Sequence, residues 1–304
     1  MIPCVELCPD GPKISALVYG TWRILDQPTP PTTAELTARF EACLALGITT
    51  LDTAEIYAGY SVESAIGKVF TDQPALRDRM EVITKCGIDI PSDEKVFARL
   101  PHYNASAKNL IACAEKSLRL LEVDVLDVFL VHRPDWLTSA DETASGLTQL
   151  IEQGKIRHAG VSNYTPAQFE LLQSRMEKPL VTNQVELSLL AMDALYDGTL
   201  AQAEQLRRRP MAWSPLAGSR LFDPEDAAAK RITTCMDGIR AKYHGADNAA
   251  LAFAWIMAHP SKPIPVIGTN QIERIRSTAE ATAIKLERQD WYALWEAAKG
   301  HSVP

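Results

Sequence analysis

The segment VLDVFLVH, residues 125 to 132, opens a stretch in which strand-like and helix-like patterns alternate. It is followed by TASGLTQLIEQG (143–154), IRHAGVSN (156–163), TPAQFELLQSRM (165–176) and LVTNQVEL (180–187). The first, third and fifth segments are short and rich in β-branched and apolar residues, which is typical of buried strands. The other two have helical spacing. This order predicts parallel strands that are joined by helical crossovers.

The same alternation extends in both directions along the chain. The further strand-like runs are ISALVYG (14–20), TTLDTA (49–54), EVITKCG (81–87), PMAWSPL (210–216) and PIPVIG (263–268). Two of the intervening helical segments are TTAELTARFEACLALG (32–47) and SAKNLIACAEKSLRL (106–120). Eight strands that alternate with helices predict an α/β protein with the (β/α)8 TIM-barrel fold.

The expected helices carry recognisable start and stop signals. Residues with N-capping side chains precede them, and glycines follow the last apolar turn of two of them. The expected caps are Thr32 or Thr33, Ser106, Thr165 with Pro166 at the first helical position, Gly47 and Gly154.

A single barrel accounts for the whole chain, so we expect one domain over residues 1 to 304. The main rival is a doubly wound dinucleotide-binding fold, but GxGxxG does not follow any strand and GxxxxGK[ST] is absent. Residues 88 to 105 and 217 to 247 lengthen two of the loops that follow strands. Such loops are where barrel enzymes usually build their specificity.

Composition and charge exclude several classes of protein. The 304 residues are 46% hydrophobic and 23% charged, which is ordinary for a folded, soluble protein. The excess of 38 acidic over 31 basic residues gives a net charge of -7, so we expect no nucleic-acid partner. No secretory signal and no membrane-spanning stretch is present, which predicts a cytoplasmic protein without a membrane partner.

The six cysteines show no CxxC pair and no Cys/His cluster with zinc-ligand spacing. We therefore expect reduced, buried thiols and no metal site.

Polar residues stand at the ends of successive predicted strands. Asp52, Lys85 and His132 each close an apolar run, and Tyr57 follows Asp52 by five residues. In a barrel these ends meet at one mouth. Taken singly, each residue also has a purely structural explanation, such as a turn cap or a solvated surface lysine.

Together the four residues make chemical sense as one site. A phenol exchanges protons poorly at neutral pH unless a neighbouring cation favours its ionised form. Lys85 can supply that charge to Tyr57, Asp52 can keep the lysine charged, and His132 can direct an N–H toward the same reacting oxygen.

The motifs GITTLDTAEIY, VITKCGI, LVHRPD and GVSNY, in this order, resemble the aldo-keto reductase superfamily. The resemblance runs from Gly20 to about residue 285, and YAGYSVE, KCGI and MAWSPL are similar to segments of its bacterial oxidoreductase branch. It implies an enzyme that reduces aldehydes or ketones with NADPH. By position, Asp52, Tyr57, Lys85 and His132 match the family's catalytic residues, with Tyr57 as proton donor and Lys85 depressing its pKa.

The resemblance also implies the cofactor-binding residues. Ser162, Asn163 and Gln184 match the residues that bind the nicotinamide carboxamide, and Trp213 matches the aromatic residue that stacks on the ring. The segment 214 to 221 matches the loop over the pyrophosphate, and Asp52 matches a position that also contacts the cofactor. The remaining matching positions are Gly20, Thr21 and Trp22 near the nicotinamide, and Ser214, Pro215, Leu216 and Gly218 in the pyrophosphate loop.

After the last predicted strand, Gly268 and Thr269 lead into a helix that contains Arg274. A helix N-terminus attracts phosphate, and an arginine can bind the same group through two parallel hydrogen bonds. The resemblance implies that Thr269, Asn270 and Arg274 bind the 2′-phosphate of NADPH. Gly268 stands where some branches have Lys, so the sequence leaves the strength of the preference over NADH open.

Two readings of a different class remain. One is a cofactor-binding regulatory or redox-sensing module with little turnover, because fold alone does not specify activity. The other is a metal-dependent barrel lyase, which the lack of a carboxylate/His cluster at the strand ends disfavours. The small-molecule carbonyl substrate, the direction of the reaction in the cell and the oligomeric state are not fixed by the sequence, although a monomer is compatible with it.

Overall fold

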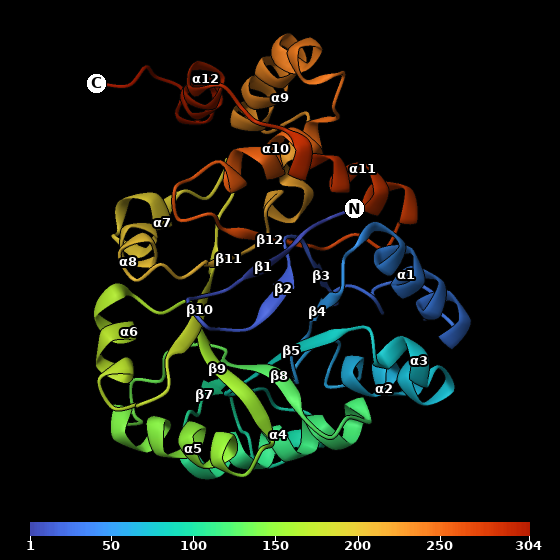
Figure 1. The fold of residues 1–304 in the computed structure, drawn as a ribbon, viewed down its shortest axis with the longest axis vertical. Helices are drawn as coiled ribbons and strands as arrows, with labels where there is room; N and C mark the ends of the chain where they lie inside the picture. The colour runs from blue at the N-terminus through green and yellow to red at the C-terminus, as the bar shows by residue number, and fades with distance from the viewer.

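The computed structural model describes residues 1–304 and forms a closed barrel of eight parallel strands with helices around it (Figure 1). Around the barrel the strands follow one another in chain order. They are β3 (Val18–Gly20), β4 (Thr50–Asp52), β5 (Glu81–Cys86), β8 (Leu126–Val131), β9 (Ile156–Ser162), β10 (Leu180–Glu186), β11 (Met211–Trp213) and β12 (Ile264–Ile267). The predicted (β/α)8 fold is therefore confirmed, and each of the eight predicted runs contributes one barrel strand.

The first predicted strand was wrong in its extent. Residues 14 to 20 do not form one strand, because Ile14 and Ser15 belong to β2 (Lys13–Ser15), which pairs in antiparallel fashion with β1 (Cys4–Glu6). Only Val18–Gly20 joins the barrel. The sequence analysis also missed the hairpin of β6 (Ile88–Asp89) and β7 (His102–Tyr103), which lies within the long loop 88 to 105.

The β1–β2 hairpin lies across the barrel and closes its amino end (Figure 1). The backbone N–H of Arg209, just before β11, donates to the carbonyl of Leu7 at 2.7 Å. Leu7 and Ile14 are fully buried and belong to the same apolar cluster as Val18 and Val128, which lie on barrel strands. This end of the barrel is therefore filled with hydrophobic side chains and serves stability.

Three of the major helices on the outside of the barrel begin where the sequence predicts. Thr32, rather than Thr33, caps α1 (Thr33–Leu46) in a capping box with Glu35, and Gly47 ends that helix with a φ of 88°. Ser106 caps α4 (Ala107–Leu121). Thr165 forms a capping box in front of α6 (Pro166–Gln173). The helix predicted over 143 to 154 begins earlier, as α5 (Ala140–Glu152), because Ser139 caps it.

The remaining helices connect strands, fill the two long loops or follow the last strand. The short 3₁₀ helix η1 (Asp93–Lys95) lies in the first long loop. The second long loop contains η2 (Ala217–Phe222), α9 (Ala227–Ile239) and η3 (Arg240–Tyr243). The others are α2 (Val62–Asp72), α3 (Pro74–Arg77), α7 (Asp193–Tyr196), α8 (Thr199–Gln205), α10 (Asn248–Met257), α11 (Ile272–Ala279), η4 (Glu280–Ala283) and α12 (Arg288–Lys299).

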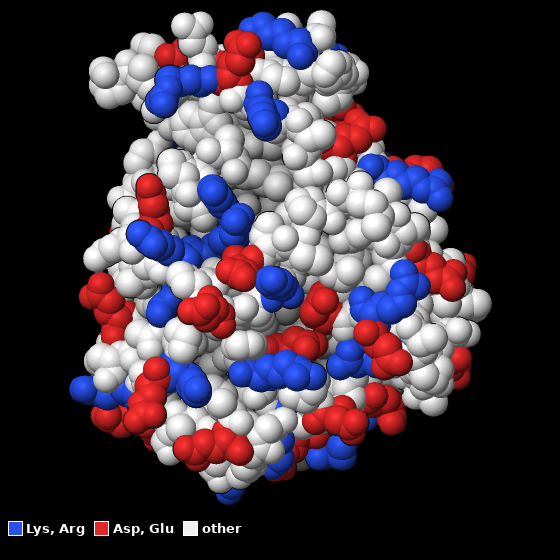
Figure 2. Space-filling model, in the orientation of Figure 1, with Lys and Arg blue, Asp and Glu red and all other residues white.

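Acidic and basic side chains are interspersed over the face of the molecule that Figure 2 shows, and neither sign dominates it. This distribution agrees with the small negative net charge of the chain. None of the helices is both long and apolar enough to cross a membrane.

Candidate active site

Three of the predicted residues meet at the carboxyl end of the barrel. The Nζ atom of Lys85 donates hydrogen bonds to Asp52 Oδ2 at 2.8 Å, to the Thr53 carbonyl at 2.8 Å and to Tyr57 Oη at 3.0 Å. Lys85 and Asp52 are almost completely buried, with 0% and 3% of their surfaces exposed. The ammonium group thus connects a carboxylate to a phenol inside the protein.

The local fold explains why these side chains converge. Asp52 ends β4 and Lys85 lies near the end of β5, and the two strands are adjacent in the barrel. The chain then turns back, since the N–H of Glu55 donates to the carbonyl of Lys85 at 3.0 Å. This turn places Tyr57 over the ammonium.

The backbone just after Tyr57 is strained. Ala58, Gly59 and Tyr60 all have left-handed φ angles, of 45°, 63° and 72°. Non-glycine residues adopt this conformation at a cost, and such positions cluster at functional sites.

The pKa of Tyr57 differs from the sequence-based expectation. We expected Lys85 to depress it, and the lysine does act in that direction. However, burial of the phenol has the larger effect, so the net pKa of Tyr57 lies above its ordinary value. Tyr57 is therefore protonated at neutral pH, as a proton donor must be, and Lys85 limits how far the pKa rises.

Asp52 is held from both sides. Its second oxygen, Oδ1, accepts a hydrogen bond from Gln184 Nε2 at 2.7 Å. Burial by itself lowers the pKa of Lys85, yet attraction to Asp52 and Tyr57 outweighs burial and leaves that pKa raised. The lysine is consequently a cation. Gln184, which we expect to bind the nicotinamide carboxamide, directs its amide nitrogen toward Asp52.

His132 lies immediately after β8 beside the phenol. The ring centroids of His132 and Tyr57 are 6.2 Å apart in an edge-to-face arrangement. Burial, together with the positive charges of Lys85 and Arg133, holds the pKa of His132 well below its usual range. Its Nδ1 atom is buried without a hydrogen-bond partner in the protein. The other ring nitrogen, Nε2, also has no hydrogen-bond partner in the protein and is not buried, so the neutral imidazole can offer Nε2 to a polar ligand atom.

The expected nicotinamide-binding residues form one connected group at the ends of neighbouring strands. Asn163 Nδ2 donates to Ser162 Oγ at 2.7 Å, and Trp213 Nε1 donates to Asn163 Oδ1 at 2.9 Å. Asn163 has a left-handed φ of 60°. This network fixes the orientation of the indole ring of Trp213.

The loop expected over the pyrophosphate has an unusual backbone. Ser214, Ala217, Gly218 and Ser219 all have left-handed φ angles between 50° and 81°. Left-handed turns of this kind can aim backbone N–H groups into one concavity, which binds anions. The loop thus suits a phosphate group, with Pro215 and Leu216 as its middle residues.

The end of β3 and the start of α11 lie next to this loop. Asn270 Nδ2 donates to the carbonyl of Arg23 at 2.6 Å. A side-chain atom built on Gly218 would come within 3.6 Å of the Arg23 guanidinium. Thr21 is buried and its hydroxyl donates to the Asp52 carbonyl at 3.0 Å. Segments that are about 250 residues apart in sequence are thereby joined at one edge of the mouth.

The other predicted residues of this edge are Gly20, Trp22, Gly268, Thr269 and Arg274. Gly20 is tightly packed, since an added Cβ would lie 2.7 Å from Val266. Trp22 is 54% exposed on the rim. Thr269 Oγ1 accepts the N–H of Gln271 in front of α11, whereas Gly268 and Arg274 are exposed to solvent.

Two arginines near the site were missed from the sequence. The Arg133 guanidinium lies 5.7 Å from the Trp213 ring, and its charge acts on the pKa of both Tyr57 and His132. Arg23 borders the expected pyrophosphate loop. Each directly follows a residue that the sequence analysis named, His132 or Trp22, and that adjacency was the available signal.

Comparisons with known proteins agree with this geometry. The profile of the "Aldo/keto reductase family" matches residues 16–299. The chain is 44% identical to the 6-dehydroglucose reductase of Agrobacterium fabrum over 299 residues, which are 97% of each protein. It is 42% identical to oxidoreductase YdhF of Escherichia coli over the full length of both.

A solved structure of an aldo/keto reductase from Klebsiella pneumoniae, in complex with NADP and acetate, has the same fold. It superimposes with a TM-score of 0.77 at 25% identity and covers 99% of this chain and 97% of its own.

Proposed function

The chain belongs to the aldo/keto reductase family and is an NADP(H)-dependent oxidoreductase, and from this premise we propose that it reduces an aldehyde or ketone to an alcohol with Tyr57 as proton donor. The observation that carries this proposal is the 3.0 Å contact between Lys85 Nζ and Tyr57 Oη, with the half-buried imidazole of His132 beside the phenol. A carbonyl oxygen placed between Tyr57 and His132 meets two hydrogen-bond donors.

The roles of the residues follow from their protonation states. His132 is neutral, so it orients the carbonyl through an N–H without adding charge. Tyr57 gives up its phenolic proton to the carbonyl oxygen as negative charge develops there. Lys85 stabilises the phenolate that remains, and Asp52, held by Gln184, keeps the lysine charged and in place. NADPH, when held by the residues named below, would supply the hydride for the carbonyl carbon.

The structure offers a fitting set of contacts for this cofactor. The indole of Trp213 provides a flat surface for the nicotinamide, with Ser162 and Asn163 beside it. The left-handed loop 214 to 221 suits the pyrophosphate. We propose that Thr269, Asn270 and Arg274 bind the 2′-phosphate at the N-terminus of α11.

For the substrate we propose an aldehyde of a hydroxylated, sugar-like compound. The similarity to a 6-dehydroglucose reductase supports this class. Arg133 supports it too, because a guanidinium next to the reaction centre is a good donor to hydroxyl oxygens. We further propose that the reaction takes place in the cytoplasm, since all six cysteines are free.

A turnover assay tests the proposed reaction. Oxidation of NADPH would be followed by absorbance with a panel of apolar aldehydes, sugar-derived aldehydes including 6-dehydroglucose, and ketones. We expect turnover, with the highest kcat/KM for the sugar-derived aldehydes. Tight binding of NADPH without turnover on any member of the panel would contradict the proposal and favour a regulatory cofactor-binding module.

A further inference from the structure

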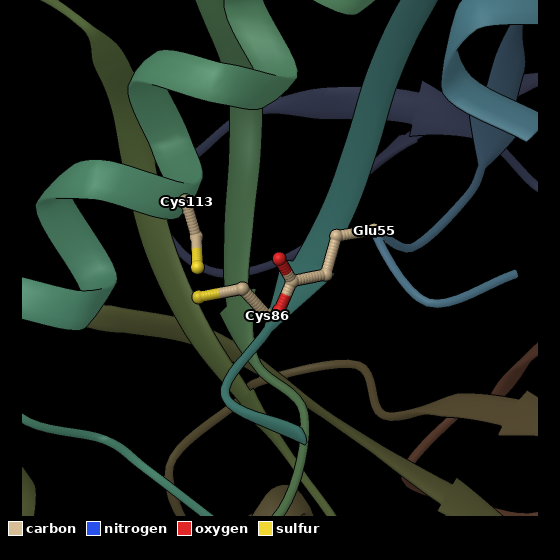
Figure 3. Close-up of side chains that lie close together, drawn as sticks. All are labelled: Glu55, Cys86 and Cys113. Carbon is tan, nitrogen blue, oxygen red and sulfur yellow. The ribbon is translucent and has the colours of Figure 1, made fainter. Parts of the chain in front are cut away.

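A buried group of reactive side chains lies next to the catalytic residues, and the proposed reaction does not use it. Cys86 ends β5, Cys113 lies in α4 and Glu55 lies in the turn after β4. The two sulfur atoms and a carboxylate oxygen all lie within 4.8 Å of one another. Figure 3 shows the sulfurs facing each other with the carboxylate of Glu55 beside them. Cys86 is 0% and Cys113 3% exposed.

A positive charge lies at the edge of this group. Lys95 Nζ is 2.7 Å from Asp89 Oδ1, 3.7 Å from Glu55 Oε2 and 3.7 Å from Cys113 Sγ. A neighbouring ammonium favours the thiolate form of a cysteine, which is the nucleophilic form. The same ammonium disfavours binding of a metal ion here, because it already neutralises the carboxylates of Asp89 and Glu55.

The two thiols have different surroundings. Burial is the main cause that raises the pKa of Cys86 well above the ordinary value, so Cys86 keeps its proton. Cys113 has the ammonium of Lys95 at 3.7 Å, the carboxylate of Glu55 close by, and a hydrogen bond from its sulfur to Asn109 Oδ1 at 3.6 Å. Two adjacent cysteines, one of them in contact with an ammonium group, are the arrangement of a reactive cysteine with a resolving partner.

We propose that Cys113 and Cys86 form an oxidation site for hydroperoxides that closes to a disulfide. The Cys113 sulfur gives up its proton and attacks the outer peroxide oxygen, the O–O bond breaks, and the other oxygen leaves with that proton as water or an alcohol. The Cys86 sulfur then attacks the sulfenic acid, the S–O bond breaks, and the hydroxyl leaves with the Cys86 proton as water. Two electrons pass from the thiols to the peroxide.

The loop of residues 88 to 105, whose Lys95 contacts Cys113, is the route by which a peroxide can reach the two cysteines. Residues 88 to 105 hold only the two-residue strands β6 and β7 and one turn of 3₁₀ helix. Segments with so few backbone hydrogen bonds open locally at a low free-energy cost. An opening of residues 96 to 105 that leaves the ion pairs of Lys95 in place admits a small hydroperoxide to Cys113.

The disulfide changes the catalytic site because Cys86 directly follows Lys85. The carbonyl of Cys86 also accepts the N–H of His132 at 2.8 Å. A disulfide needs the sulfur atoms about 2.05 Å apart, so its closure draws the end of β5 toward α4. We expect the Lys85 to Tyr57 contact to lengthen and turnover to fall. This consequence rests on the proposed reductase function, whereas the disulfide itself does not.

The test uses the reduced full-length protein and hydrogen peroxide as the probe. After treatment, free thiols are alkylated and peptides are identified by mass spectrometry, and NADPH-dependent turnover is measured on the same samples. We expect a peptide pair that links Cys86 to Cys113, together with lower turnover that dithiothreitol restores. Cys113→Ser should show no linkage and should keep its turnover under the same treatment.

Two matched controls are available. Cys4→Ser removes an exposed thiol and Cys43→Ala removes a buried one in α1, and both variants should still form the linkage. Cys86→Ser should instead accumulate sulfenic acid on Cys113, which dimedone labels. Lys95→Met should slow formation of the linkage, and a rate equal to that of the wild type would contradict the activation of Cys113.

Absence of the Cys86–Cys113 linkage at peroxide doses that oxidise Cys4 would overturn the proposal. A linkage that forms without any change of turnover would overturn its catalytic consequence. Because the linkage is detected without an activity assay, a failure of the proposed reductase function is distinguishable from a failure of the oxidation site.

Discussion

Two buried lysines, Lys85 and Lys95, both lie near Glu55 and make similar contacts in different settings. Lys85 is on a central barrel strand, and all its partners are also at strand ends or in the short turn that follows. Lys95 ends a single 3₁₀ turn in a long loop and contacts Asp89, Glu55 and Cys113. Both ammonium groups are compensated by carboxylates.

This comparison indicates that the residues around a buried lysine determine the role of its ammonium group. The partners of Lys85 include a phenol that faces the mouth of the barrel, and the rigid strands hold the pair in one geometry. The partners of Lys95 include a thiol that a loop covers. We therefore propose proton donation at the Lys85 site and regulation by oxidation at the Lys95 site. Variants of the two lysines should differ accordingly.

The largest expected effect is on the Lys85 site. Lys85→Met removes the charge that stabilises the Tyr57 phenolate, so we expect turnover at neutral pH to fall by about 10² to 10⁴. The phenol then loses the positive charge that opposes the effect of burial on its pKa, so the pKa of Tyr57 rises further. The pH above which the residual activity falls should therefore also be higher. Steady-state kinetics across pH measures both effects. An unchanged pH profile would make Lys85 a structural residue.

At the Lys95 site the expected effect is on stability rather than on turnover. Lys95→Met leaves Asp89 and Glu55 buried without their cation, and the loss of one partner from a buried ion pair costs about 3 to 5 kcal/mol. Denaturant unfolding measures this loss. The double variant with Asp89→Asn should recover part of it, and turnover of the reduced protein should stay within a few-fold of wild type. A turnover loss as large as that of Lys85→Met would abolish the distinction between the two sites.

A cation at the surface extends the comparison. Arg274 is exposed, and a charge-assisted contact with the 2′-phosphate is worth about 1.5 to 3 kcal/mol, or roughly 10- to 150-fold in affinity. Arg274→Ala should weaken binding of NADPH by this factor and leave NADH nearly unchanged, and the difference should shrink at high salt. Tryptophan fluorescence titration with both cofactors measures it. Equal weakening of both would mean that Arg274 supports the loop instead of contacting the phosphate.

A further effect, seen only as a pH dependence of stability, concerns a buried carboxyl group whose hydrogen-bond partners are hydroxyls. Glu63 accepts hydrogen bonds from Thr84 at 2.6 Å and Ser117 at 3.0 Å, and burial raises its pKa to about 7. A raised pKa in the folded state means that its stabilising contribution is complete below the unfolded value, about 4.3, and is lost as the pH rises through about 7.

The Glu63→Gln variant should therefore show a flatter dependence of melting temperature on pH between these two values. Glu225→Gln, on the exposed second loop, is the control and should keep the wild-type slope. If Glu63→Gln kept that slope as well, the carboxyl group would not be responsible for it.

Much of the barrel and its mouth was predictable because the signals are local. Strand-like runs that end in Asp52, Lys85 and His132 identify both the fold and the edge where chemistry occurs, since parallel strands in a barrel share that edge. The capping residues Thr32, Ser106 and Thr165 likewise act over three or four positions.

The remaining features depend on distant contacts. Ile14 and Ser15 do not belong to the first barrel strand because they pair with β1. Ser15 lies opposite Cys4, and Ile14 lies opposite Val5. The position of Gln184 against Asp52 joins residues 132 apart in sequence. The net pKa of Tyr57 depends on burial, which no residue spacing reports.

The central claim is that Tyr57 donates the proton without contributing to cofactor binding. The most direct test is to measure turnover and NADPH affinity side by side in Tyr57→Phe. We predict that turnover falls by about 10² to 10⁴ or more while the dissociation constant for NADPH, followed by quenching of tryptophan fluorescence, stays near the wild-type value. Turnover equal to that of the wild type would contradict the assignment of Tyr57 as the proton donor.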